Sequence, residues 1–208
     1  TMTLAQVLKH TTVVPVLEIE DADHAVPLDR DLVAGGLYAL EITLRTPAAM
    51  EAIRRIAGEV EGAVVGAGTI TSAAARHAAA DAGARFGVSP GLIDGEGVDG
   101  PIPLLPGIAT ATELMWGLKA GYTHFKLFPA TIVGGVPLLK AFHSPFPQAV
   151  FCPTGGVDAA NAAEFLAQPN VICVGGSWVA PKDAVQGGEW SRITALAKAA
   201  ASLGKAPV

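Results

Sequence analysis

One feature constrains the fold of this chain more than any other: short apolar runs alternate with alanine-rich stretches from one end of the sequence to the other. The apolar runs are rich in β-branched residues and have strand length, whereas the stretches between them have helical length. A helix after each strand predicts parallel pairing, because each crossover returns the chain to the same end of the sheet. Parallel strands are buried on both faces, which agrees with a hydrophobic content of 50%.

The alternation predicts eight strands, at residues 12–17, 38–44, 63–66, 85–88, 102–105, 124–128, 149–152 and 171–174. Helices are predicted at residues 23–34, 47–59, 72–82, 110–120, 136–142, 158–167 and 189–203. Eight strand–helix units in 208 residues predict an α/β fold, a (β/α)8 TIM barrel formed as a single domain by residues 1–208. The alternative is a doubly wound open sheet, which usually contains fewer strands.

Two local features refine this prediction. Residues 91–101 read GLIDGEGVDGP, and four glycines at about 1 kcal/mol each disfavour a full helix there. A loop or a single turn is expected, so the helix after the fourth strand is degenerate. Pro47 fits the first position of the second predicted helix, residues 47–59, and Thr46 before it fits the N-cap.

The composition excludes several classes of protein. The net charge is −5, from 14 Lys and Arg against 19 Asp and Glu, and no basic patch predicts nucleic-acid binding. No apolar stretch approaches the roughly 20 residues that span a bilayer, and residues 1–10 lack the pattern of a signal peptide. Cys152 and Cys173 lie in apolar runs without disulfide or zinc spacing, and are predicted to be buried thiols of a cytoplasmic protein.

Lys126 stands in the middle of an apolar run, THFKLFP. Burying an ammonium group is costly, because the charged form loses its hydration. Helices cover the outer face of a barrel strand, so the side chain is expected to point inward or to extend its amine into water. The functional interpretation is a nucleophilic lysine that forms a Schiff base with a carbonyl substrate. The alternative is a lysine with a buried stem and a hydrated amine.

Strand alternation in YALEITLR places Glu41, Thr43 and Arg45 on one face of the second predicted strand. Three polar side chains that face into a barrel do not form a hydrophobic core. A carboxylate near a Schiff-base lysine can transfer protons to and from the reaction intermediates, and Arg45 can bind a substrate carboxylate. The alternative is an internal Glu41–Arg45 ion pair that only fills space.

Glycine-rich turns follow several predicted strands, at the rim where (β/α)8 barrels have their active sites. Residues 154–156 (TGG) follow the seventh strand and residues 175–177 (GGS) follow the eighth, where backbone N–H groups commonly bind phosphate. The turn at residues 66–69 (GAGT) lacks a dinucleotide-binding fingerprint. No metal-ligand spacing is found among the histidines, which are His10, His24, His77, His124 and His143 and are predicted to be surface or packing residues.

Seven segments, in this order along the chain, carry a resemblance to a known family: LEITLRTP, VGAGTI, SPG, PGIATATELM, FKLFPA, FCPTGG and VGGSW. Together they resemble the class I 2-keto-3-deoxy-6-phosphogluconate (KDPG) aldolase family, which includes 4-hydroxy-2-oxoglutarate aldolases. The resemblance covers residues 13–199, nearly the whole chain.

The resemblance implies a role for each matched residue. Lys126 matches the Schiff-base lysine, and Glu41 matches the general acid and base. Arg45 and Thr69 match the residues that bind the pyruvyl carboxylate, and Pro90 and Phe128 match those that shape the pocket around it. The phosphate would be bound by Gly155, Gly156 and Ser177. Thr154, which would contact a hydroxyl in the middle of the substrate, favours the gluco epimer, because relatives that accept the galacto epimer often have valine there.

The activity implied is the metal-independent cleavage of KDPG to pyruvate and D-glyceraldehyde 3-phosphate, without a cofactor, by a homotrimer. Its partner would be a small phosphorylated keto acid. Three alternatives stay open: an aldolase for the galactonate epimer or for 4-hydroxy-2-oxoglutarate, a metal-dependent pyruvate aldolase, and a barrel that binds a sugar phosphate without catalysis. The chain departs from some relatives at the end of the first strand, where Leu17 and Glu18 stand in place of an arginine.

Overall fold

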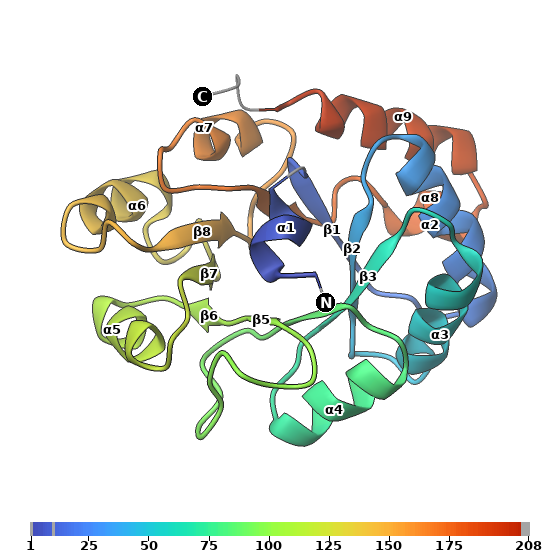
Figure 1. Cartoon of the computed structure of the whole chain (residues 1–208). Helices are drawn as coiled ribbons and strands as arrows, with labels where there is room; N and C mark the ends of the chain where they lie inside the picture. The colour runs from blue at the N-terminus through green and yellow to red at the C-terminus, as the bar shows by residue number, and fades with distance from the viewer. Residues whose placement is uncertain (1, 10, 205–208) are drawn as a thin grey trace.

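Parallel strands curve into a barrel, and helices cover its outer face (Figure 1). The structure is a computed structural model that describes residues 2–9 and 11–204. The prediction for His10 lies outside the described residues. Its strands are β1 (Val13–Leu17), β2 (Ala39–Thr43), β3 (Val64–Gly68), β4 (Phe86–Val88), β5 (Leu104–Leu105), β6 (Gly107–Ile108), β7 (His124–Leu127), β8 (Val150–Pro153) and β9 (Val174–Gly176).

The helices alternate with these strands. They are α1 (Leu4–Leu8), α2 (Ala25–Ala34), α3 (Ala49–Glu59), α4 (Ala73–Asp81), α5 (Ala111–Lys119), α6 (Gly135–His143), α7 (Ala162–Leu166), α8 (Lys182–Gln186) and α9 (Trp190–Ala201), with a short 3-10 turn η1 (Ala22–His24) before α2. Within residues 2–9 and 11–204, no helix is long and apolar enough to cross a membrane.

The strand order explains how the barrel closes. One sheet has the order β5-β4-β3-β2-β1-β9, and a second has the order β6-β7-β8. A parallel bridge between Thr154 and Gly175 joins the β8 side to β9. At the other seam only Pro106 separates β5 from β6, and proline has no N–H to donate to a sheet. Of the fifth predicted strand, residues 102–105, the structure keeps Leu104 and Leu105 as β5, and β6 lies beyond its predicted end. Together β5 and β6 complete the predicted barrel.

The inside of the barrel is apolar at the amino ends of the strands. Inward-facing side chains from several strands, among them Val14, Phe86 and Cys152, pack against Val7 and Leu8 of α1. Figure 1 shows α1 lying across this end of the barrel. Because α1 closes the amino end, the carboxyl ends of the strands are the end at which a polar site can open to solvent. Cys152 and Cys173 are both buried, as predicted.

Residues 91–101 contain no helix, which confirms the expected loop. The loop is held by Arg76 of α4, whose side chain is fully buried. Its guanidinium donates to the Ile102 carbonyl at 2.7 and 3.0 Å and pairs with Glu96 at 2.7 Å. The Arg76 side chain therefore donates hydrogen bonds to backbone carbonyls that are not paired within a helix.

Three local predictions differ from the structure. The helix α3 begins at Ala49 instead of Pro47, and Thr46 donates its hydroxyl to the Ile19 carbonyl instead of capping the helix. The last strand begins at Val174, three residues later than predicted at its start. The short helices α1 and α8 were not predicted, because five residues are too few for a periodic pattern.

Candidate active site

Lys126 and Glu41 meet inside the barrel. Lys126 lies on β7 and Glu41 on β2, and the Lys126 Nζ is 3.8 Å from the Glu41 Oε1. Each residue is only 3% exposed. Lys126 therefore points inward, and the alternative in which its amine extends into bulk water is wrong. The pair places an amine and a carboxylate at the centre of an otherwise apolar barrel, where an amine can attack a carbonyl carbon and a carboxylate can exchange protons.

The space for the Glu41 carboxylate comes from a glycine on the neighbouring strand. Thr43 of β2 pairs with Gly68 of β3, and a Cβ atom at position 68 would overlap the Glu41 carboxylate. Burial raises the pKa of Glu41 above its ordinary value, while the positive charges of Lys126 and Arg45 oppose the rise. The Glu41 Oε1 accepts no hydrogen bond from the described residues. This oxygen is consequently available to a substrate or a water molecule.

Two further matched residues border Lys126. The Lys126 Nζ lies 4.7 Å from the centre of the Phe128 ring. Pro90 follows β4, and its carbonyl packs against Gly107. Gly107 pairs with Lys126 across β6 and β7. Phe128 therefore follows the strand that carries Lys126, and Pro90 lies against β6, the strand that pairs with it.

Arg45 and Thr69 form a second contact near the pair. The Arg45 Nε donates to the Thr69 hydroxyl at 2.9 Å. Thr69 has a φ of 58°, in the left-handed region that residues other than glycine rarely adopt. Such strain is kept where the surrounding structure needs that conformation. Here the conformation of Thr69 presents its hydroxyl to the Arg45 side chain.

The glycine turn after β8 is one of the two turns at which the sequence predicts phosphate binding. Gly155 and Gly156 have φ values of 101° and 72°. Their carbonyls accept hydrogen bonds from the Thr131 backbone N–H at 3.1 Å and from the Asn161 side chain at 2.9 Å. A Cβ atom at Gly156 would overlap the Thr131 side chain. Only glycine fits this turn, because of both its conformation and its surroundings.

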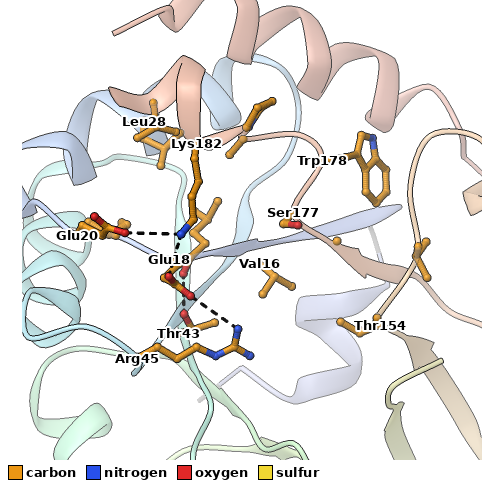
Figure 2. A pocket seen from close by; sticks show the side chains of 18 of the residues that line it. Val16, Glu18, Glu20, Leu28, Thr43, Arg45, Thr154, Ser177, Trp178 and Lys182 are labelled. Atoms are coloured by element: carbon orange, nitrogen blue, oxygen red, sulfur yellow. Dashed lines mark hydrogen bonds and ion pairs between the residues drawn. The ribbon is translucent and has the colours of Figure 1, made fainter. Parts of the chain in front are cut away.

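A cavity of about 610 Å³ connects most of these residues. The sequence-predicted residues that line it are Arg45, Lys126, Phe128, Thr154, Gly155, Gly156 and Ser177. Figure 2 shows Thr154, Ser177 and Arg45 around this space. Glu41, Thr69 and Pro90 are not among the residues that line the cavity.

The structure adds charged residues to which the sequence analysis gave no role in the site. Glu18, Glu20, Asp21 and Lys182 also line the cavity. Lys182 forms ion pairs with Glu18 at 3.2 Å and with Glu20 at 3.6 Å. Lys182 stands five residues after Ser177, as the first residue of α8, and this closeness to the predicted phosphate turn was the signal that could have found it. Among the described residues, no group of three or more His, Cys, Asp or Glu side chains could hold a metal ion.

The chain matches curated proteins over most of its length. The family described as "Aldolase: KDPG and KHG aldolase" matches residues 4–196. A 2-dehydro-3-deoxy-phosphogluconate aldolase of Pseudoalteromonas atlantica is 54% identical over 192 residues, which cover 90% of this chain and 89% of the relative. A KHG/KDPG aldolase of Escherichia coli is 49% identical over 191 residues, which cover 90% of this chain and 90% of the relative.

Solved structures agree with this assignment. KDPG aldolase from Legionella pneumophila, with pyruvate captured as a covalent carbinolamine intermediate, superposes with a TM-score of 0.91 at 45% identity, covering 94% of this chain and 96% of that chain. The aldolase of Zymomonas mobilis with 3-phosphoglycerate has a TM-score of 0.90 at 48% identity, with 97% and 96% covered. The predicted (β/α)8 barrel is confirmed, and the chain belongs to the KDPG and KHG aldolase family.

Proposed function

We infer that this chain is a class I aldolase that cleaves KDPG to pyruvate and D-glyceraldehyde 3-phosphate. The observation that carries this inference is the buried pair formed by Lys126 and Glu41, with 3.8 Å between the amine and the carboxylate. A buried amine next to a proton-transfer group is what a Schiff-base mechanism requires. The high identity to curated 2-dehydro-3-deoxy-phosphogluconate aldolases supports the same activity.

The reaction begins at the substrate ketone. The Lys126 Nζ adds to C2 to form a carbinolamine, which loses water to become an iminium ion. The iminium withdraws electrons, so the C4 hydroxyl can lose its proton while the C3–C4 bond breaks and its electron pair forms an enamine. D-glyceraldehyde 3-phosphate leaves. The enamine is then protonated at C3, and water hydrolyses the iminium to release pyruvate and the free lysine.

Glu41 moves the protons in these steps, directly or through one water molecule. It accepts the proton of the C4 hydroxyl and returns a proton to C3 of the enamine. Its raised pKa supports this double role, because a carboxyl group that holds its proton more tightly serves better as an acid and remains a usable base.

The remaining matched residues bind the two ends of the substrate. Arg45, held by Thr69, binds the carboxylate at C1, and Pro90 and Phe128 shape the pocket around the pyruvyl group. The N–H groups of Gly155, Gly156 and Ser177 with the Ser177 hydroxyl bind the phosphate at C6, since such turns are common anion sites. The cavity that these residues line supports this arrangement.

Trapping of the iminium tests the mechanism. Pyruvate with borohydride should add one reduced pyruvyl group to the peptide that contains Lys126. Lys126→Arg should abolish both labelling and turnover while the far-UV circular dichroism spectrum stays unchanged, because arginine keeps the charge but cannot form the imine. Labelling of another lysine, or activity that is lost with chelator and restored by a divalent metal, would overturn this proposal.

A second substrate has specific support. The Escherichia coli relative, 49% identical, is named a KHG/KDPG aldolase, so cleavage of 4-hydroxy-2-oxoglutarate is the second candidate activity. The same lysine chemistry would serve it, because that substrate also carries a ketone next to a carboxylate. The galactonate epimer of KDPG is a third candidate, for which Thr154 provides the discriminating position.

We also propose that the protein is a cytoplasmic homotrimer. The family resemblance supports the trimer, and the phosphorylated substrate and the two buried cysteines support the location. Neighbouring residues Met115 and Trp116 on α5 are 59% and 62% exposed, as expected of a face that another subunit covers. Size-exclusion chromatography with light scattering should give about three times the chain mass of 21.1 kDa. A monomer mass at micromolar concentration would contradict the trimer.

A further inference from the structure

A chain of ion pairs crosses the mouth of the cavity. The Glu18 carboxylate lies 3.2 Å from the Lys182 Nζ through one oxygen and 3.9 Å from an Arg45 nitrogen through the other. Lys182 also reaches Glu20 at 3.6 Å. Figure 2 shows Glu18 between the two cations, with Lys182 extending from α8 toward it. Lys182 therefore lies at the mouth of the cavity, where its side chain is still largely exposed to solvent.

The strand order explains why this network stands between the two ends of the substrate site. In the sheet, β1 lies between β2 and β9. Glu18 directly follows β1, Arg45 follows β2, and Ser177 follows β9. Lys182 comes from the same connection as Ser177, at the start of α8. The backbone of Lys182 thus belongs to the connection that follows β9, and its side chain reaches from there to Glu18 and Glu20, which follow β1.

The charges of the substrate and of the cavity wall raise the question of which side-chain cation binds the phosphate. Three lysine or arginine side chains among the described residues line the cavity, namely Arg45, Lys126 and Lys182. In the proposed function Arg45 binds the carboxylate and Lys126 is consumed in the bond to C2. The phosphate, with about two negative charges at neutral pH, would otherwise meet only backbone and hydroxyl donors beside the acidic groups of Glu18 and Glu20.

We propose that Lys182 is the side-chain cation that binds the substrate phosphate, and that Glu18 and Glu20 hold it over the cavity until the substrate arrives. This proposal rests on the proposed function. The Lys182 side chain is 67% exposed, and ion pairs at such exposure contribute little to stability. Exchanging a carboxylate for a phosphate, which offers more charge and more acceptor oxygens, is therefore favourable. The flexible stem of lysine allows its amine to move between the two.

Lys182 is a cation throughout the neutral pH range, as an ordinary lysine is. The hydrogen bond to Glu18 raises the pKa of Lys182 further, with contributions from the charges of Glu18 and Glu20. A neutral or distant lysine would gain nothing from the approach of a phosphate.

Kinetics on two substrates tests the proposal. Lys182→Gln should lower kcat/KM for the phosphorylated acid about 5- to 30-fold, mainly through KM. It should lower kcat/KM for the unphosphorylated acid much less. Lys182→Arg should recover most of the loss, because arginine also binds phosphate. Lys140→Gln on α6, which removes the same charge from an exposed residue that does not line the cavity, is the matched control. Equal losses for the two acids, or no loss for either, would overturn the proposal.

Direct binding separates this proposal from the proposed function. Isothermal titration of the wild-type protein with inorganic phosphate should give a Kd that rises at least about 5-fold in Lys182→Gln and stays unchanged in Lys140→Gln. Trapping of pyruvate on Lys126 should be equal in all three proteins, since pyruvate has no phosphate. Equal phosphate affinity in the wild type and Lys182→Gln would refute the role of Lys182, even where turnover and trapping establish the aldolase.

Discussion

The proposed proton transfers depend on the carboxylate of Glu41. Glu41→Gln keeps the shape of the side chain but removes the group that accepts a proton. We expect kcat to fall by about 10²–10⁴-fold, the usual contribution of a positioned acid or base. Trapping of pyruvate on Lys126 should persist at a lower rate, because the lysine itself is intact. A variant with near-normal kcat would leave Glu41 only a structural role.

The pH dependence of kcat/KM follows from the burial of Glu41. Because burial raises its pKa, the carboxylate loses its charge at a higher pH than an ordinary glutamate as the pH falls. The acidic limb of the wild-type profile should therefore lie above the range of an exposed glutamate, and this limb should be missing in Glu41→Gln. An identical acidic limb in both proteins would assign it to another group.

We expect Thr154 to distinguish the epimers of the substrate. Its side chain lines the cavity, and its hydroxyl makes two long hydrogen bonds, 3.4 Å to the Cys152 carbonyl and 3.9 Å to the Cys152 Sγ. A Cβ atom at Gly175 would overlap this hydroxyl, so glycine keeps the space for it. We expect a gluco preference of about 5- to 150-fold in kcat/KM, corresponding to ~1–3 kcal/mol for one buried hydrogen bond. Thr154→Val should remove most of it, and equal rates for both epimers in the wild type would contradict the prediction.

The sequence predicts some site residues better than others for a physical reason. Lys126 and Glu41 were found because a charged residue inside an apolar strand has few explanations, and strand alternation fixes the direction of its side chain. Lys182 was missed because it follows a loop, where no periodicity defines direction. Its place over the cavity depends on the β2-β1-β9 order of the strands, which only the folded barrel shows.

On the helix α2, Asp29 is fully buried, and its two carboxylate oxygens accept no hydrogen bond from the described residues. Burial raises the pKa of Asp29 well above its ordinary value. The folded protein therefore binds this proton more tightly than the unfolded chain. Its stability should fall as the pH rises from the unfolded pKa, about 3.9, toward the higher folded pKa.

Asp29→Asn should remove this pH dependence and raise the free energy of unfolding near neutral pH by about 1–3 kcal/mol. Urea unfolding at about pH 5 and about pH 8 measures both effects. Asp81→Asn is the matched control, because Asp81 is an exposed residue at the end of α4. The prediction would be contradicted if the free energy of unfolding changed between the two pH values to the same extent in the wild type and in Asp29→Asn.

The loop that replaces the fourth helix shows the limit of prediction at the scale of elements. Four glycines predict the loss of the helix, because each adds backbone entropy to the unfolded chain. They do not predict an ordered loop. The order comes from Arg76 of α4, whose buried guanidinium bonds to the Ile102 carbonyl and to Glu96. Nothing in the alanine-rich sequence around Arg76 distinguishes it from a surface arginine, so a tertiary contact decides its role.

The two ends of the barrel have different chemical character. The amino end is apolar and is covered by α1 through Val7 and Leu8. The carboxyl end carries the lysine, the carboxylate and the glycine turns. The alternation of strands and helices predicts this division, because in a parallel barrel every strand ends at the same rim. The strand β6 is not predicted by the sequence, since it lies after Pro106, beyond the end of the predicted fifth strand at residue 105.

The length of the site across this rim predicts a strong requirement for the substrate phosphate. In the proposed arrangement the carboxylate end lies at Arg45, after β2, and the phosphate end at Ser177, after β9, so one ligand must contact turns on both sides of β1. Binding energy at the phosphate end positions C2 and C3 beside Lys126 and Glu41 and so contributes to the rate as well as to affinity. Two or more charge-assisted hydrogen bonds to phosphate should therefore make kcat/KM for the unphosphorylated acid at least about 10²-fold lower. Parallel kinetics with the two acids measure the ratio, and pyruvate trapping on the same preparation confirms that the lysine is active. Ratios within about threefold would remove the phosphate role from Gly155, Gly156 and Ser177, because lost charge-assisted bonds would then carry no measurable energy.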